Sequence, residues 1–208
     1  MITGNLRYLF FVSNELDQFR NYAEYIESSL RKEVKSYVDR AEGLLPEEAE
    51  EFWEWHLDEV SPYSQDFPKI MRNSLFVSIY TFLEDKIVEL CVSDKDTLLE
   101  LSDIKGQGIH QASIYLKKVL RIDFPDNSKE WQYIKKANLI RNCIVHSSGD
   151  VSKSRNETKL RNAVQDMPSI SIDKMGYINL NDELCIDFIE NVDLFLKQLY
   201  AAVYKVDV

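Results

Sequence analysis

Apolar side chains recur every three or four residues between residues 16 and 38, which places them on one face of an α-helix. Ser13 or Asn14 is a suitable N-cap for this helix, and Gly43 lies where it should end. A second helical pattern, over residues 46–61, begins with a proline and two glutamates, which favour the first turn of a helix. The N-terminal part of the chain is therefore predicted to form a helical hairpin.

The most hydrophobic stretch of the chain covers residues 68–92, with apolar side chains around much of the helical circumference. A helix of that kind is buried on several sides, so we expect it at the centre of a bundle. Shorter helical patterns follow over residues 106–120, 129–146, 155–166 and 182–205. Before the last of them, residues 169–172 and 177–180 alternate apolar and polar side chains around a turn, which predicts a small β-hairpin.

Together these elements predict an all-α fold: an antiparallel helical bundle with an N-terminal helical hairpin extension and one small β-hairpin before the last helix. The 6 glycines and 5 prolines are too few for a turn-rich all-β protein. A length of 208 residues fits one domain with an elaboration. We expect residues 1–62 to be the extension, packed on the bundle, and residues 63–208 to be the main helical domain.

Membrane segments, cofactors and metal sites are not indicated. No apolar run is long enough for the core of a signal peptide or for a membrane span. The 3 cysteines are an odd number without a C-x-x-C pair, so we expect reduced, mostly buried thiols in a cytoplasmic protein. His56, His110 and His146 are also scattered, which makes a zinc site improbable. We therefore predict no metal and no cofactor.

Charge is distributed unevenly along the chain. The net charge is -10, yet residues 105–161 contain 12 Lys and Arg against 5 Asp and Glu, and the remainder contains 13 against 30. A basic field on an acidic body can attract a polyanion such as RNA. Each lysine of the segment, taken alone, can equally belong to a solvated helix face.

The basic segment contains the string RNCIVH over residues 141–146, at the end of a helical pattern. It couples a permanent cation, Arg141, to an imidazole, His146, that exchanges protons near neutral pH. Cleavage of an RNA backbone without a metal needs one group that moves protons and one that stabilises negative charge on the phosphate. The string therefore provides the two side chains that this chemistry requires.

On a helical wheel drawn at about 100° per residue, Arg141 and His146 lie about 140° apart, too far to touch on a straight helix. Arg141 projects from an apolar arc, where a guanidinium needs a partner or the mouth of a cleft. The two groups could meet if the helix loosens at residues 147–149, or if a second copy supplies the matching group across a two-fold axis. Two simpler roles remain open: a salt bridge for Arg141 and a C-terminal helix cap for His146.

The pattern Arg-Asn-x-x-x-His at the end of a helix in an antiparallel bundle resembles the signature of the HEPN superfamily. That signature is an Arg followed, after four to six residues, by a His, often with Asn, Asp or His directly after the Arg. Arg141, Asn142 and His146 match these positions, and the hydrophobic helix near residues 75–92 resembles the core helix of the family. The resemblance implies that residues 63–208 form a HEPN-like domain.

The resemblance implies a metal-independent endoribonuclease with a composite site at a homodimer interface, in bacterial toxin–antitoxin or antiphage defence, with an antitoxin or other protein partner. It implies that His146 deprotonates the ribose 2′-hydroxyl or protonates the leaving oxygen, that Arg141 holds the phosphate and that Asn142 orients His146. Some toxins of the family carry a modifiable Tyr two residues after the His, and Ser148 does not support that mechanism here. Further polar side chains are predicted to contact RNA: Lys117, Lys118, Lys135, Asn138 and Arg155.

A non-catalytic HEPN-like module that binds RNA, a nucleotide or a protein partner is the alternative function. The acidic, tryptophan-containing stretch of residues 47–59 favours a protein partner, because its carboxylates would repel RNA. Residues 105–108, Lys-Gly-Gln-Gly, could cradle a phosphate at a helix start, but they lack the full P-loop pattern and are more typical of a flexible helix start. Cys143 lies between the motif residues and is expected to be buried and inert.

Overall fold

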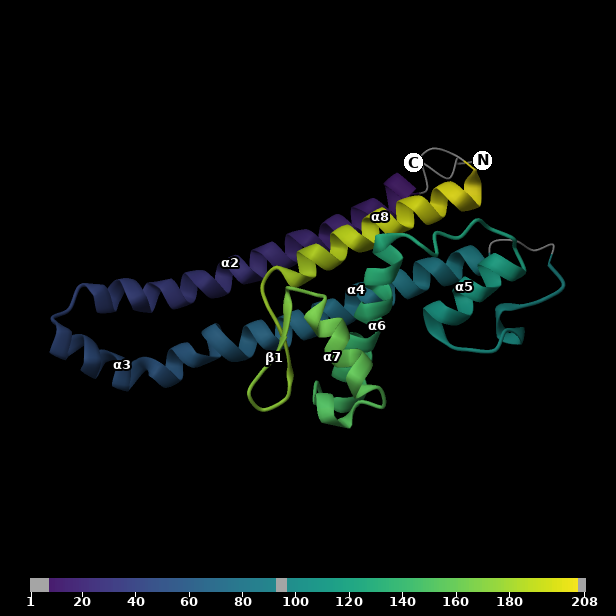
Figure 1. Cartoon of the computed structure of the whole chain (residues 1–208). Helices are drawn as coiled ribbons and strands as arrows, with labels where there is room; N and C mark the ends of the chain where they lie inside the picture. Colours follow the sequence, from purple (N-terminus) through teal and green to yellow (C-terminus); the bar gives the residue numbers. More distant parts are fainter. Residues whose placement is uncertain (1–7, 93–96, 206–208) are drawn as a thin grey trace.

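The computed structural model of the chain is predominantly α-helical, which confirms the predicted fold class. It describes residues 8–92 and 97–205 (Figure 1). Residues 1–7 of the predicted extension and residues 206–208 of the predicted main domain therefore lie outside the described residues. The longer helices are α2 (Asn14–Glu42), α3 (Pro46–Ser61), α4 (Phe67–Val92), α5 (Gly108–Lys118), α6 (Lys129–Ser147), α7 (Glu157–Gln165) and α8 (Leu184–Tyr204). Over these described ranges, no helix combines the length and the apolar character needed to cross a membrane.

Helix α4 lies at the centre of the molecule, as its hydrophobicity predicts. Helices α2, α5, α6 and α8 all pack against it. In Figure 1, α2 and α8 run side by side above α4, whereas α6 runs across the direction of α4. Phe76 of α4 is fully buried against Phe188 of α8, with 4.8 Å between the ring centroids. Burying one such ring stabilises the fold by roughly 1.5–3 kcal/mol, so this contact joins α8 firmly to α4.

Helical structure begins before the predicted N-cap. The π-helical segment η1 (Tyr8–Ser13) leads directly into α2. Ser13 has helical angles, φ −62° and ψ −42°, and its side chain makes no capping hydrogen bond. The predicted N-cap at Ser13 or Asn14 is therefore wrong. Val12, which is buried in the core, gives the physical reason, since the continuing helix carries this apolar side chain into the bundle.

The chain also stays helical between α3 and α4. The segment η2 (Pro62–Asp66) is π-helical, and the N–H of Phe67 donates to the carbonyl of Pro62, five residues earlier. A proline lacks an N–H and crowds the preceding turn, and the wider π-helical turn accommodates it. The boundary predicted between residues 62 and 63 therefore falls inside a continuous helical stretch.

The two halves of α2 have different surroundings. Leu16 and Ala23 in its first half belong to the main hydrophobic core, together with residues of α4 and α8. Its second half pairs with α3, and the two form an arm that projects beyond the other helices in Figure 1. Only this arm, and not the whole N-terminal segment, stands apart from the bundle.

The later elements follow the predicted pattern closely. Strands β1 (Ile170–Ile172) and β2 (Ile178–Leu180) pair antiparallel, which confirms the β-hairpin. Helix α5 ends at Lys118, before the predicted end near residue 120, and the chain then turns through Arg121, whose φ is 54°. Ser128 caps α6 by accepting a hydrogen bond of 3.1 Å from the N–H of Trp131. This cap sets the start of the helix that carries the Arg141–His146 motif.

The thiols Cys91, Cys143 and Cys185 are free and buried, as predicted. Burial raises the pKa of Cys91 and of Cys185 to about 12, and it also raises the pKa of Cys143. We expect maleimide or iodoacetamide at pH 8 to leave all three unmodified in the native protein, because only the thiolate reacts. Mass spectrometry should find all three labelled after unfolding in guanidinium. Fast labelling of native Cys143 would contradict its buried position.

Candidate functional site

Arg141, Asn142 and His146 lie near the end of α6 and line one cleft. Its walls come from α4, the start of α5, the end of α6 and the residues that follow α6, and it encloses about 670 Å³. Helix α6 remains α-helical as far as Ser147, so the loosening considered for residues 147–149 does not begin before His146. Arg141 and His146 share the cleft because it extends along α6 and around its C-terminal end.

The end of α6 is fixed by backbone hydrogen bonds. Ser148 adopts the left-handed conformation, with φ 52°, and its N–H donates to the carbonyl of Cys143. Gly149, with φ 81°, donates to the same carbonyl at 3.0 Å. This termination is typical of helices that end in a left-handed residue. It reverses the chain just after His146, so that Lys153 and Arg155 also line the cleft.

Arg141 is half-buried and has no acidic partner among the residues that the structure describes. Its guanidinium lies over the ring of Tyr80, with 5.5 Å from Cζ to the ring centroid, and its Nη1 donates to Asn142 Oδ1 at 3.1 Å. Its Nε is buried without a hydrogen-bond partner. Across residues 8–92 and 97–205, no carboxylate forms an ion pair with it, so a salt bridge does not explain its position. A buried N–H without an acceptor costs roughly 1–3 kcal/mol, and a bound ligand could recover that cost.

Asn142 does not orient His146 as predicted. Its Oδ1 accepts from Arg141, and its Nδ2 donates to Asn138 Oδ1 at 3.1 Å. The amide is therefore engaged toward Arg141 and the preceding turn, and the expected hydrogen bond to the imidazole is replaced by these two. Asn142 thus positions the guanidinium of Arg141.

His146 is exposed to solvent at the mouth of the cleft. Its ring makes no hydrogen bond to any part of the chain that the structure describes, so it does not cap the last carbonyls of α6. Both ring nitrogens are free to exchange a proton with a ligand.

The other predicted RNA contacts divide into two groups. Asn138 and Arg155 line the cleft with the motif residues. Lys117, Lys118 and Lys135 do not. Lys117 is held by Asp126, with Nζ 2.9 and 3.0 Å from the two carboxylate oxygens, because the turn after α5 brings Asp126 back to the helix end. Lys118 and Lys135 are exposed and are not among the residues that line the cleft.

Several lining residues were not predicted from the sequence. Tyr80 and Glu84 come from α4. Gln107 and Gly108, at the start of α5, belong to the run considered as a phosphate cradle and then set aside as a flexible helix start. Lys153, which pairs with Asp150 at 3.0 Å, adds a further cation. The basic run after the motif could have suggested Lys153, but no local pattern marks two side chains of the central hydrophobic helix. Among the described residues that line the cleft, the cations Arg141, Lys153 and Arg155 outnumber the one carboxylate, Glu84, so the cleft favours an anionic ligand.

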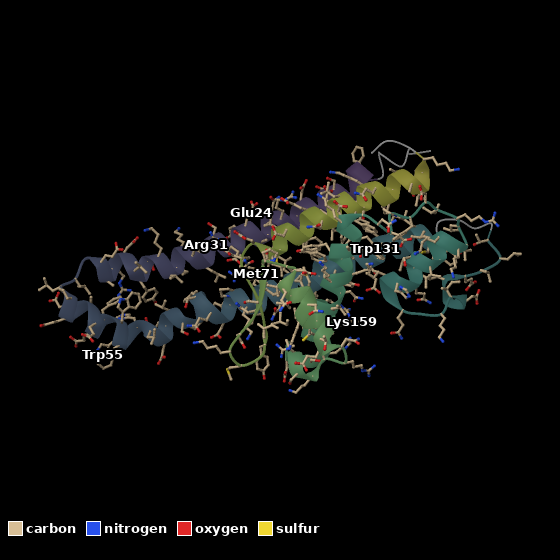
Figure 2. The ribbon with its side chains drawn as sticks, viewed as in Figure 1. Glu24, Arg31, Trp55, Met71, Trp131 and Lys159 are labelled. Atoms are coloured by element: carbon tan, nitrogen blue, oxygen red, sulfur yellow. The ribbon has the colours of Figure 1, made fainter. Side chains whose placement is uncertain are left out.

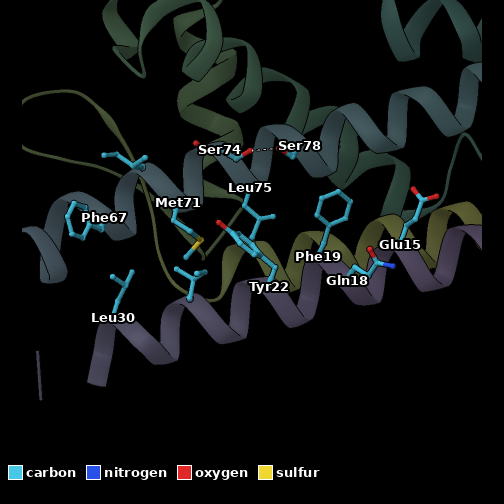
Figure 3. A pocket seen from close by; sticks show the side chains of 12 residues that line it. Glu15, Gln18, Phe19, Tyr22, Leu30, Phe67, Met71, Ser74, Leu75 and Ser78 are labelled. Carbon is cyan, nitrogen blue, oxygen red and sulfur yellow. Dashed lines mark hydrogen bonds between the residues drawn. The ribbon is translucent and has the colours of Figure 1, made fainter. Parts of the chain in front are cut away.

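A second, larger cavity of about 780 Å³ has a different character. It is an apolar groove between α2 and α4, shown in Figure 3, where Phe19 and Tyr22 of α2 face Met71 and Leu75 of α4. The hydroxyl of Ser78 on its wall is already bonded to the carbonyl of Ser74 at 2.8 Å. The groove contains no combination of proton-transfer and anion-binding groups, so the polar cleft remains the candidate for chemistry.

Within the described ranges, no three His, Cys, Asp or Glu side chains are grouped so that they could hold a metal ion. Neither a family profile, nor a curated protein, nor a solved structure matches this chain. The geometry of the cleft is therefore the basis for assigning a function.

Proposed function

We propose that this chain is a metal-independent endoribonuclease of HEPN type. The observation that carries the proposal is that Arg141 and His146 line the same polar cleft. The buried Nε of Arg141 has no acceptor, and His146 is accessible to solvent. A guanidinium binds phosphate through several N–H groups at once, and an imidazole transfers protons near neutral pH. The cations Lys153 and Arg155, which line the same cleft, would extend the contact to neighbouring phosphates.

In the proposed reaction, the ribose 2′-oxygen attacks the adjacent phosphorus and the bond from phosphorus to the 5′-oxygen breaks. The products are a 2′,3′-cyclic phosphate and a 5′-hydroxyl. His146 takes the proton from the 2′-hydroxyl or gives one to the leaving 5′-oxygen. Arg141 stabilises the negative charge that develops on the phosphoryl oxygens, and Asn142 holds the guanidinium in place.

One imidazole performs only one of the two proton transfers at a time, which supports a homodimer in which a second copy contributes the complementary group. By its resemblance to the HEPN superfamily, the protein would act in the cytoplasm, in bacterial toxin–antitoxin or antiphage defence. Its partners would then be RNA and an antitoxin or another controlling protein.

We expect the purified chain to cleave single-stranded RNA in the presence of EDTA and to leave DNA of the same sequence intact. The 2′-hydroxyl is the nucleophile, so its removal should abolish the reaction. Mass spectrometry of the products should find 2′,3′-cyclic phosphate ends. Cleavage that stops on addition of EDTA, or that leaves 5′-phosphate ends, would contradict the mechanism.

The alternative, a module that binds a protein partner without catalysis, is favoured by one observation. The indole of Trp55 points outward from α3 in Figure 2 and is 74% exposed. Glu51 and Asp58, one turn before and after it, are exposed as well. An aromatic ring within a field of carboxylates suits a basic protein surface. Saturable partner binding without RNA turnover would favour this function over the first.

A further inference from the structure

The cleft contains one feature that phosphate binding leaves unexplained. Within the described chain, Glu84 is the one acidic side chain that lines the cleft. It lies one turn after Tyr80 on α4, close to the start of α5. A Cβ on Gly108 would come within 2.8 Å of Glu84 Oε1, and Gly108 has φ +59°, so a glycine at this position leaves room for the carboxylate.

Glu84 and Arg141 share the cleft without pairing. Arg141 is engaged by the Tyr80 ring and by Asn142, and its Nε has no acceptor. Glu84 makes no hydrogen bond or ion pair with another residue of the described ranges. Both charges therefore have unused hydrogen-bonding capacity toward the same space. A carboxylate repels phosphate, so the group that meets Glu84 must be a hydrogen-bond donor.

In RNA, the donors that match a carboxylate are on the base edges. Guanine presents N1–H and N2–H side by side on its Watson–Crick edge, which fit the two oxygens of one carboxylate. Adenine and cytosine offer one amino group each, and uracil offers one imino N–H. Single-stranded RNA is commonly read in this way, through exposed edges and stacking on flat side chains. The guanidinium of Arg141 and the ring of His146 are such flat groups in this cleft.

We propose that Glu84 is a specificity-determining residue that binds the Watson–Crick edge of a guanine next to the phosphate held by Arg141. The substrate class is then single-stranded RNA with a guanosine beside the cleaved bond. This inference rests on the proposed function, because it assumes that the cleft binds RNA. It adds a base preference that the Arg141–His146 pair alone does not provide.

The test uses uncleavable 2′-fluoro oligonucleotides, so that binding is measured independently of catalysis. Fluorescence anisotropy should compare a short adenine- and uracil-containing strand that has one guanine with the same strand carrying inosine, which lacks the N2 amino group. A bidentate contact is worth roughly 1–3 kcal/mol of discrimination. Loss of one of its two donors should therefore weaken binding to the wild type about tenfold.

Glu84→Gln should reduce this ratio to near one, because an amide presents only one acceptor. Asp85→Asn is the matched control: Asp85 is the adjacent carboxylate on α4, is exposed and lies outside the cleft, so its removal should leave the ratio unchanged. Thermal melting of both variants verifies that they are folded. An adenine strand should bind the wild type at least as weakly as the inosine strand.

The outcomes separate the two proposals. RNA binding by the wild type with equal affinity for guanine and inosine would overturn the role of Glu84 and leave the ribonuclease proposal standing. A preference that survives Glu84→Gln would also overturn it. Absence of any RNA binding would remove both proposals. The same two sequences made as ordinary RNA report on cleavage: slowing by Glu84→Gln that is equal on the guanine and inosine strands would overturn the role in base recognition and assign the carboxylate to catalysis.

Discussion

Replacing His146 by alanine is expected to lower the rate of RNA cleavage by roughly 10²–10⁴-fold, the usual contribution of a positioned proton-transfer group. The imidazole is exposed and makes no hydrogen bond within the described chain, so its removal should leave the fold intact. The cap at Ser148 and Gly149 uses backbone groups only and is unaffected. Single-turnover cleavage in EDTA measures the loss, and the thermal melting temperature verifies folding.

His110→Ala is the matched control for this variant. His110 is also exposed and also on a helix, but it does not line the cleft. Its replacement should leave cleavage unchanged. Full activity in His146→Ala would contradict the assignment of the site. Equal cleavage by the wild type and both variants would point to chemistry elsewhere in the chain or to a contaminant.

Replacing Arg72 by methionine is expected to destabilise the fold by about 3–5 kcal/mol, the typical cost of breaking a buried ion pair. Arg72 on α4 holds Glu27 on α2 through two hydrogen bonds, of 2.6 and 2.9 Å, and donates a third of 3.2 Å to the carbonyl of Leu180. The side chains are only 18% and 9% exposed. Without the guanidinium, the Glu27 carboxylate would be buried without its partner. For a protein of this size the melting temperature should fall by roughly 6–20 °C.

Arg31→Met gives the comparison. Arg31 pairs with Asp182 at 3.2 Å, but its side chain is 67% exposed, and such pairs contribute less than about 1 kcal/mol. A double variant that replaces Glu27 and Arg72 with leucine and methionine should recover much of the stability lost in Arg72→Met, since no charge then remains buried. Equal destabilisation by Arg31→Met and Arg72→Met would show that burial does not set the contribution of the pair. Denaturant unfolding curves measure all three variants.

Much of the helical architecture could be predicted from hydrophobic spacing. The central position of α4 follows from apolar side chains around much of its circumference, and the β-hairpin follows from alternation around a turn. The errors lie where local signals compete with packing. Ser13 is a good capping residue, yet the helix runs past it because Val12 is buried. Pro62 is a good helix stop, yet a π-helical turn continues through it.

The candidate site was predicted only in part. Arg141, Asn142 and His146 are close in sequence, so one motif could identify them. Their contacts could not be predicted in the same way. Asn142 and His146 are four residues apart and so are neighbours on a helix, but this spacing does not show that Asn142 Oδ1 accepts a hydrogen bond from Arg141. Lys117 illustrates the same point, because a turn places Asp126 against it and removes it from the site.

The sequence by itself determined the helices, their amphipathic faces and the presence of a cation and an imidazole at one helix end, because these depend on residues near one another along the chain. Only the tertiary structure decided that Tyr80 and Glu84 complete the cleft and that the acidic arm stands apart from it. It also decided that Arg141 has no acidic partner within the described part of the chain. These features depend on which faces of distant helices meet when the core closes around α4, and that choice is made by packing rather than by local pattern.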